Sequence, residues 1–344
     1  MTSRDQRLEA PHRRLEPSSR FLERVVIFGY RAGAALLARI SPGISRAVIG
    51  RAAQASYLLW PMKRRWSNTN FGHVLGLRPD HPEVRRLALR AYKEYGRYVV
   101  ELMRLPSRPL SEIQAGVDAP GALRLIEAWR AHGGPLIISP GHVGNNEAAA
   151  AGLAKLEVPV HVVADDSMFP ELFELLSAQR ISWGVGVVPW RNLRAMYSIL
   201  RRNEILALVV DWGYRADGVP VKMFGAWTTL PAGPATLAAR TGALLAHIAV
   251  RRNPDGSFRV EAEAPFTVPD NAPASIQRAT QELASALERT IRVAPEQWYS
   301  FKPCWPRDPE EAVALEARAA AMLADTRATG GTGRADLATD ASAR

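Results

Sequence analysis

From Pro135 onward, short runs of aliphatic and β-branched residues alternate with stretches of helical periodicity. This alternation is typical of a sheet whose strands are joined by crossover helices. It predicts strands at residues 136–138, 158–163, 185–188, 205–210, 219–224, 244–251 and 258–264. It predicts helices at residues 145–156, 170–179, 193–202, 234–241 and 275–293. We therefore expect an α/β fold with a central mixed, mostly parallel sheet wrapped by helices.

The first third of the chain has a helical rhythm instead. Residues 83–105 carry apolar side chains at the spacing of an amphipathic helix that ends before Pro106. Residues 21–62 are apolar, but five arginines interrupt them and no run reaches the ~20 residues needed to span a bilayer. On a helix, Arg24, Arg31 and Arg39 would share one side and leave much of the rest apolar. We expect N-terminal membrane-interface helices; ordinary helices packed on the protein body are the alternative.

Charge and cysteine content narrow the class of partner. The 44 Lys and Arg residues exceed the 34 Asp and Glu residues, giving a formal net charge of +10. This balance favours a polyanionic partner without naming it: nucleic acid and anionic lipid both qualify, and the charge also fits a merely solvated surface. Of the two partners we expect an anionic membrane surface and no nucleic acid. The single cysteine, Cys304, excludes an internal disulfide and a thiolate metal cluster. The histidine spacings match no metal site, so we expect neither a metal nor a cofactor.

Changes in composition divide the chain into four parts. Residues 1–20 are basic, lack the apolar core of a cleavable signal peptide and are expected to be disordered. Residues 21–110 form the helical, membrane-associated region, and residues 111–308 form the α/β domain. Residues 309–344 are expected to begin as a helix and to end as a disordered tail, because large apolar side chains almost vanish there.

The most informative segment is LIISPGHVGNNE, residues 136–147. An apolar strand runs into Gly141 and delivers His142 just before a helix begins, and such strand-exit loops are where α/β sheets bind ligands. His142 and Glu147 are five residues apart, which on one continuous helix would separate them by about 140°. A bend at Gly144, with Asn145 capping the helix, would let the carboxylate fold back to the imidazole.

A histidine paired with a carboxylate can act as a general base. The neutral imidazole takes the proton of an attacking hydroxyl, and the carboxylate fixes its tautomer and stabilises the imidazolium. The chain has no G-x-S-x-G elbow and Cys304 lies far along the sequence, so direct transfer without a covalent intermediate is the simpler expectation. Backbone N–H groups of residues 141–145 are candidate oxyanion donors. The H-x4-E spacing alone is common by chance.

Several ordered blocks together resemble a known family. GHVGNNE is similar to the H-x4-D/E block of the lysophospholipid acyltransferase superfamily, in its bacterial branch of lipid A late acyltransferases and phosphatidylinositol mannoside acyltransferases. The further blocks, in order, are AYKEYGRYVVELMRLP, RNEILALVVDWGYRADGVPVKMFG, TTLPAGPATLAARTGALLAHIAVRR and PEQWYSFKPCWP. The likeness covers residues 20–308. The chain departs from the family at Asn146, at Met223 and in WYSFKPCWP, which bears on the acceptor more than on the chemistry.

The resemblance implies residue roles. It carries the general-base role onto His142 and the orienting role onto Glu147. It suggests Arg180 as a phosphate or headgroup contact, Asp211 as a pocket residue, and the turn that begins at Pro231 as part of the lipid site. Among the further substrate-binding candidates, Gly141 and Asn145 come from the motif itself. Arg191 belongs to a basic group that could meet lipid phosphate or an acidic carrier protein, or could be solvated surface.

The resemblance also implies an activity and a place in the cell. It implies O-acyl transfer from acyl-CoA or acyl-carrier protein to a membrane lipid, by a peripheral or monotopic protein on the cytoplasmic face of the cell membrane. LPAGPATLAARTGA and PEQW favour a phosphatidylinositol mannoside or related glycolipid acceptor. A lipid A precursor or a lysophospholipid remains open. A non-catalytic basic membrane-binding protein and a thioesterase or lipid hydrolase are the alternatives from other classes.

Overall fold

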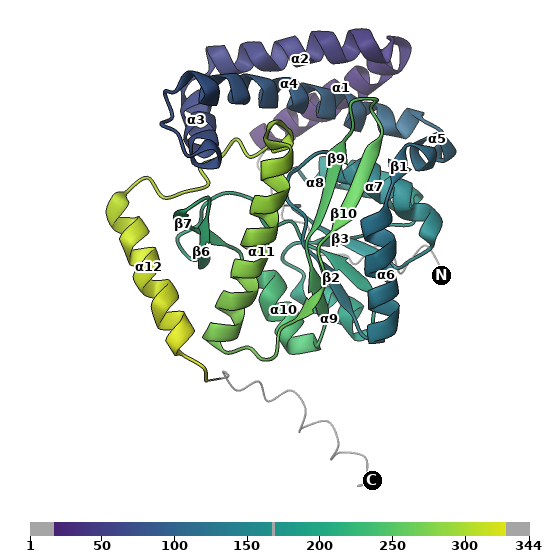
Figure 1. Ribbon diagram of the computed structural model, residues 1–344. Coiled ribbons are helices and arrows are strands. Elements are labelled where there is room, and N and C mark those ends of the chain that lie inside the picture. Colours follow the sequence, from purple (N-terminus) through teal and green to yellow (C-terminus); the bar gives the residue numbers. More distant parts are fainter. Residues whose placement is uncertain (1–16, 167–168, 328–344) are drawn as a thin grey trace, which may run out of the picture.

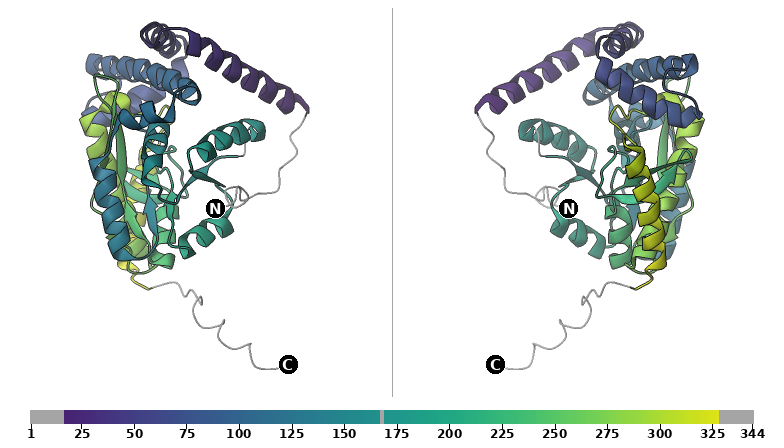
Figure 2. Two further views of the ribbon diagram at one scale, coloured as in Figure 1. Left: turned by 90° about the vertical axis from the view of Figure 1, so that its right-hand side faces the viewer. Right: turned by 90° about the vertical axis from the view of Figure 1, so that its left-hand side faces the viewer.

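The computed structural model describes residues 17–166 and 169–327, and its chain begins with a layer of four helices. Prolines occupy the first turns of the second, third and fourth helices, where the fixed backbone angle suits a helix start. Helix α1 is fastened to the body by Arg104, which donates to the carbonyls of Leu37 and Ile40 near its end. Figure 2 shows α1 running out from this layer toward the side where α8 lies. The four helices are α1 (Pro17–Arg39), α2 (Pro42–Leu59), α3 (Pro61–Leu75) and α4 (Pro82–Arg104).

A six-stranded sheet forms the centre of the molecule (Figure 1). Its strand order is β11-β8-β2-β5-β3-β4, and all neighbours are parallel except the edge strand β11, which is antiparallel to β8. The strands are β2 (Leu136–Ile138), β3 (Val160–Ala164), β4 (Gly186–Pro189), β5 (Ile205–Ala207), β8 (Leu244–Ala246) and β11 (Phe266–Thr267). The predicted fold class is confirmed.

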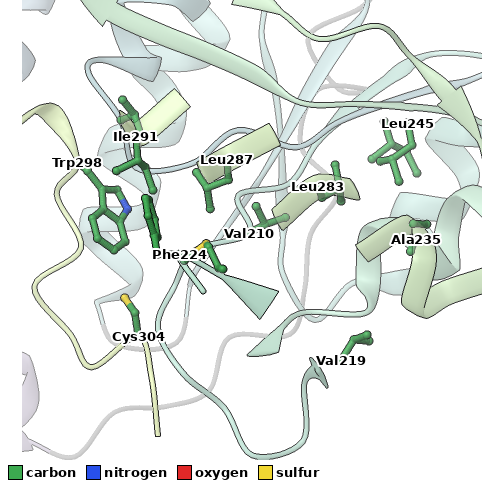
Figure 3. Close-up of a cluster of buried hydrophobic side chains, with 14 of the residues drawn as sticks. Val210, Val219, Phe224, Ala235, Leu245, Leu283, Leu287, Ile291, Trp298 and Cys304 are labelled. Atoms are coloured by element: carbon green, nitrogen blue, oxygen red, sulfur yellow. The ribbon is translucent and has the colours of Figure 1, made fainter. Parts of the chain in front are cut away.

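Helices cover both faces of this sheet, so its strands are apolar on both sides. On one face Leu136 packs with Leu125 of α6. On the other, Ile137 joins the largest core cluster, to which α9, α10 and α11 contribute. Figure 3 shows Leu283, Leu287 and Ile291 of α11 in this core, with Trp298 beside Ile291. The helices around the sheet are α6 (Pro120–His132), α7 (Asn146–Leu153), α8 (Pro170–Ser182), α9 (Leu193–Arg201), α10 (Gly233–Thr241) and α11 (Pro273–Val293).

Smaller elements complete the fold. A three-stranded sheet has the order β1-β10-β9, and a hairpin joins β6 to β7 beside α11 and α12. The remaining strands are β1 (Val117–Asp118), β6 (Val219–Met223), β7 (Ala226–Leu230), β9 (Ile248–Arg252) and β10 (Phe258–Ala262). The remaining helices are α5 (Leu110–Ala115), α12 (Pro309–Ala324) and the 3-10 turns η1 (Leu105–Ser107), η2 (Ala154–Leu156) and η3 (Pro295–Gln297).

The sequence predictions differ from the structure at identifiable points. The predicted strand 244–251 divides at His247, whose ring bonds to the Ser139 carbonyl and to Thr290, and the chain passes there from the six-stranded to the three-stranded sheet. Strands β1, β7 and β11 and helix α6 were not predicted. Helix α1 begins at Pro17, before the predicted start of the helical region. The predicted disorder of residues 1–16 and 328–344 lies outside the described residues, and the domain boundaries remain predictions.

The N-terminal helices expose large apolar side chains. On α1, Phe21, Val25, Phe28 and Leu36 recur at helical spacing and are each at least half exposed. Apolar residues on α2 and at the start of α3 are similarly exposed: Ile44, Val48, Leu58, Leu59, Trp60 and Met62. Within residues 17–166 and 169–327, no helix combines the length and apolar character required of a membrane span. We call these exposed side chains of α1, α2 and α3 the apolar face.

Candidate active site

The site forms where two neighbouring parallel strands end. Strands β2 and β5 pair with Ile138 opposite Ala207, and the register continues beyond the strands through bonds from Leu208 N to Ile138 O and from Val210 N to Pro140 O. His142 and Asp211 each follow the last residue of their strand by four positions. The common register therefore brings these two residues to the same point at the carboxyl edge of the sheet, where α/β folds bind ligands.

His142 and Asp211 form a hydrogen-bonded pair. The imidazole Nδ1 lies 2.7 Å from Asp211 Oδ1, and the backbone N–H of His142 donates to both carboxylate oxygens at 2.9 Å. Because the carboxylate accepts at Nδ1, the neutral ring carries its proton there and keeps a lone pair on Nε2. No hydrogen bond within the described ranges engages Nε2, and the His142 side chain is 33% exposed. Its free nitrogen can therefore meet a substrate.

Charge and burial set the ionisation of this pair. Burial disfavours the imidazolium, but the charge and hydrogen bond of Asp211 outweigh it and raise the pKa of His142 above 6.5. Burial likewise opposes ionisation of Asp211, but the charge and bonds of His142 and the indole N–H of Trp298 lower the pKa of that carboxyl. Asp211 is thus a buried carboxylate that stays ionised and holds the base in one tautomer.

The segment that carries Trp298 also fixes the backbone of the histidine loop. Gly144 N donates to the Gln297 carbonyl and Tyr299 N donates to the His142 carbonyl, both at 2.9 Å, forming a short antiparallel bridge. Trp298 Nε1 donates to Asp211 Oδ2 at 2.8 Å. In the sequence, PEQW resembles a family ending and favours a glycolipid acceptor, but it does not indicate a contact with the histidine loop. Only the tertiary structure shows that it supports both members of the pair.

The prediction that Glu147 orients His142 is wrong in this structure. Glu147 instead accepts from Arg180, at 2.5 Å from Nη2 and at 3.1 and 3.2 Å from Nε. Both side chains are 17% exposed, and this ion pair joins α7 to α8. Asp211, which follows the adjacent strand β5, contacts the imidazole directly. Glu147 lies in the first turn of α7, and its side chain points toward Arg180. Asp211, predicted as a pocket residue, takes the orienting position.

At two of the predicted substrate-binding residues, the structure gives the side-chain position a structural role. Asn145 is fully buried; its oxygen caps α7 by accepting from Ala148 N, and its amide donates to Glu101. This confirms Asn145 as the helix cap, and its side chain is engaged within the protein, so a substrate contact would have to use its backbone N–H. Gly141 is buried, and a Cβ there would lie 2.5 Å from Leu287 and 3.2 Å from the Asp211 carboxylate. Only glycine allows the carboxylate to approach so closely.

The other predicted contacts lie in different surroundings. Arg180 uses Nε and Nη2 to hold Glu147, so its predicted phosphate contact would compete with that pair. Arg191 is exposed and lies over the ring of Trp190 at 4.8 Å. Pro231 is half-buried in the turn between β7 and α10. Their substrate contacts remain predictions.

Comparison with known proteins places the chain in a family. The model of the family described as "Bacterial lipid A biosynthesis acyltransferase" matches residues 13–307. The chain belongs to this acyltransferase family. It is similar to a phosphatidylinositol mannoside acyltransferase of Mycolicibacterium smegmatis, with 28% identity over 292 residues that cover 83% of this chain and 92% of the relative. Proteins of the same description from two Mycobacterium tuberculosis strains, CDC 1551 and H37Rv, are each 28% identical over 250 residues, covering 70% of this chain and 77% of the relative.

This acyltransferase has no reactive thiol in its described residues. Cys304 is buried, and burial raises its pKa to about 12 although Ser300 and Asn70 bond to the sulfur. A thiol in that state is a poor nucleophile. Over the same part of the chain, no group of three or more His, Cys, Asp and Glu side chains could hold a metal ion.

The bonds of the histidine loop also narrow the choice of oxyanion donors in the acyltransferase. The backbone N–H of His142 is used by Asp211, and that of Gly144 is used by the Gln297 carbonyl. These two groups are therefore not available to a developing oxyanion. Of the segment predicted to supply donors, the N–H groups of Gly141, Val143 and Asn145 remain as candidates.

Proposed function

We propose that this chain is an O-acyltransferase that moves a fatty acyl group from acyl-CoA or acyl-carrier protein to a hydroxyl of a membrane glycolipid similar to a phosphatidylinositol mannoside. The observation that carries the proposal is the bond between His142 Nδ1 and Asp211, which leaves Nε2 as a base at the edge of the sheet. Membership of a lipid acyltransferase family supports the reaction class. The curated relatives' descriptions support the acceptor class.

In the proposed reaction, His142 Nε2 accepts the proton of the acceptor hydroxyl as its oxygen forms a bond to the thioester carbonyl carbon. The carbonyl electron pair moves to oxygen and gives a tetrahedral oxyanion. That pair then returns, the carbon–sulfur bond breaks, and the thiolate leaves with its electrons. The imidazolium gives its proton from Nε2 to the thiolate, so the base is restored and an ester and a free thiol are the products.

Asp211 contributes to this reaction by its charge. While His142 holds the extra proton, the buried carboxylate faces an imidazolium, and the attraction stabilises the intermediate state. The carboxylate needs no proton of its own for this, since three donors already satisfy its oxygens: the backbone and ring of His142 and the indole of Trp298. The high pKa of Cys304 supports direct transfer rather than an acyl-cysteine intermediate.

The apolar face supports action at a membrane surface. Its large apolar side chains are about half exposed or more, and side chains of this kind bind well at a lipid interface. Arg24, Arg31 and Arg39 of α1 are exposed beside them and would be attracted by anionic headgroups. We propose that the protein is peripheral or monotopic, on the cytoplasmic face of the cell membrane.

A transfer assay tests the proposal. The purified chain is incubated with palmitoyl-CoA and phosphatidylinositol mannoside vesicles, and ester product and free thiol are measured separately. We expect product in the wild type and loss of about a hundredfold or more in His142→Ala, because a general base is removed. Thiol release without acceptor would instead indicate a thioesterase. Equal product in His142→Ala would overturn the mechanism, and complete absence of product would favour a non-catalytic membrane protein.

The acceptor is tested in cells. Deleting the gene should leave one lipid species short by a single acyl chain, and mass spectrometry of the lipid extract identifies it. We expect a glycolipid similar to a phosphatidylinositol mannoside. A lipid A precursor or a lysophospholipid that lacks one chain would overturn this choice of acceptor while leaving the reaction intact.

A further inference from the structure

Lys302 stands on a rigid backbone beside the active site. The Asn70 side chain on α3 donates to the Lys302 carbonyl at 2.7 Å and to the Ser300 carbonyl at 2.9 Å. Tyr214 N donates to the carbonyl of Pro303 at 2.8 Å. The loop that bears Lys302 is thus bonded on one side to α3 and on the other to the segment following Asp211, so its position relative to the catalytic pair is fixed.

The side chain of Lys302 lies over an aromatic ring that contacts the base. Its Nζ is 3.7 Å from the ring centroid of Trp212, and the centroid of Trp212 is 5.4 Å from that of His142. Trp212 is 53% exposed, so the ring that connects the ammonium to the imidazole is open to solvent. The charge of Lys302 is also among the influences that lower the pKa of His142. The ammonium therefore lies close to the base, on the aromatic ring that contacts it.

A second lysine adds to the positive charge there. Burial lowers the pKa of Lys302, the charge of Lys63 lowers it further, and Asp165 acts in the opposite direction. Lys63, on α3, lies over Trp66 at 4.9 Å, and Arg307 lies over the same ring at 5.9 Å. In the part of the chain that the structure describes, neither lysine forms an ion pair with a carboxylate. Two neighbouring cations, whose charge Asp165 offsets only in part, favour a bound anion.

We propose that Lys302, assisted by Lys63, binds a phosphate group of a substrate beside the His142 site. The inference rests on the proposed function, in which both substrates carry that chemistry. Acyl-CoA and acyl-carrier protein bear their thioester on a phosphorylated arm, and a phosphatidylinositol-type acceptor has a phosphodiester. A phosphate held by Lys302 would fix one point of the substrate near the base and so restrict where its reacting carbonyl or hydroxyl can lie.

Kinetics with Lys302→Met test the contact, because methionine keeps an apolar stem over Trp212 and removes the charge. Loss of one charge-assisted contact is expected to raise KM for one substrate about ten- to a hundredfold, with kcat changed much less. Lys302→Arg should recover much of the affinity. Lys222→Met, which removes an exposed lysine from β6 whose backbone is bonded to Gln281 of α11, is the matched control and should match the wild type.

Substrates without phosphate show whether Lys302 binds the phosphate of the acyl donor or that of the lipid acceptor. If the donor phosphate binds, Lys302→Met should impair palmitoyl-CoA but spare the N-acetylcysteamine thioester of palmitate. If the acceptor phosphate binds, KM for the lipid should rise with either donor. The proposal is overturned if all constants stay within about twofold of wild type, or if the variant is equally impaired with the N-acetylcysteamine thioester and an alkyl mannoside, a pair lacking phosphate.

A binding measurement that needs no turnover keeps this proposal distinct from the proposed function. Calorimetry should show tighter binding of coenzyme A than of pantetheine, or of glycerophosphoinositol than of inositol, and Lys302→Met should abolish the difference. If the protein prefers the phosphorylated ligand through Lys302 but has no transferase activity, the proposed function is contradicted and the phosphate contact stands. If Lys302→Met leaves the preference for the phosphorylated ligand unchanged, or if the wild type has no such preference, the phosphate contact is contradicted and the proposed function is unaffected.

Discussion

Trp298 donates its indole N–H to Asp211 Oδ2 at 2.8 Å, while the imidazole of His142 bonds to Oδ1 of the same carboxylate. Trp298 is fully buried and packs edge-on against Phe71 and Trp305. The carboxylate therefore has a donor on each side, and its plane is fixed relative to the imidazole. A residue far along the chain holds the partner of the base in place.

The first prediction concerns that indole. Trp298→Phe keeps an aromatic ring but removes one of the two donors to the buried Asp211 Oδ2, the other being the backbone N–H of His142. We expect a loss of about 1–3 kcal/mol in the free energy of unfolding, measured by urea denaturation, together with a lower kcat. Trp305→Phe is a matched control, since the Trp305 N–H is buried without a partner and its removal leaves no acceptor unsatisfied. If Trp305→Phe loses as much unfolding free energy as Trp298→Phe or more, the smaller ring explains the destabilisation and the hydrogen bond does not.

The second prediction separates Asp211 from Glu147 by pH. In the wild type the base must be neutral, so kcat/KM should fall as the pH drops through the raised pKa of His142, above 6.5. Asp211→Asn removes the charge that raises this pKa. The acid limb should then move to lower pH, and the maximal rate should fall about a hundredfold or more. Glu147→Gln should leave the limb in place. If the acid limb of the pH profile shifts in Glu147→Gln and not in Asp211→Asn, Glu147 is the residue that orients His142.

The third prediction concerns the ion pair of Glu147 with Arg180. Removing one partner of a mostly buried pair leaves an uncompensated charge, so Glu147→Ala should lower the free energy of unfolding by up to about 3–5 kcal/mol, less to the extent that water screens it. The double variant Glu147→Ala, Arg180→Ala should be more stable than the single one. Thermal unfolding checks the order. A double variant less stable than Glu147→Ala would show that the two side chains are not coupled.

The fourth prediction concerns Gly144. Its φ is +64°, and a Cβ there would lie 1.8 Å from the Val250 carbonyl oxygen of β9. Gly144→Ala must therefore push β9 away from the histidine loop, and we expect loss of soluble folded protein or a large fall in the melting temperature. Gly184→Ala is a useful comparison, because that glycine also has a positive φ but open space around it. Similar stability of both variants would refute the steric argument.

The fifth prediction concerns the apolar face. Phe28 is 74% exposed on α1, and inserting its ring into lipid should contribute about 1.5–3 kcal/mol. Phe28→Ser should weaken binding to anionic vesicles roughly tenfold or more, as measured by sedimentation. Val313→Ser alters an apolar residue of α12 that is 67% exposed and should leave binding unchanged. Equal binding by the two variants would place the membrane contact elsewhere.

Local pattern was sufficient for much of the fold and for the base. Strand β2 has its predicted bounds, and the other predicted strands recur within a few residues because apolar runs bounded by breakers fix where a strand can lie. The place of His142 at the edge of the sheet could be predicted from one local feature, a strand that ends just before Gly141. Where two sheets meet at His247, the apolar run continued through the break, so the sequence pattern did not reveal it.

The sequence by itself determined which elements form and that His142 follows a strand, because periodicity and turn residues act over a few neighbouring positions. It did not determine the partner of the base. Glu147 is five residues from His142 and Asp211 is 69 residues away, yet the pairing of β2 with β5 gives the bond to the distant residue. Trp298 and Lys302 reach the site for the same reason. Hydrogen bonds between segments remote in the chain decide which side chains meet, and those bonds exist only once the tertiary structure has formed.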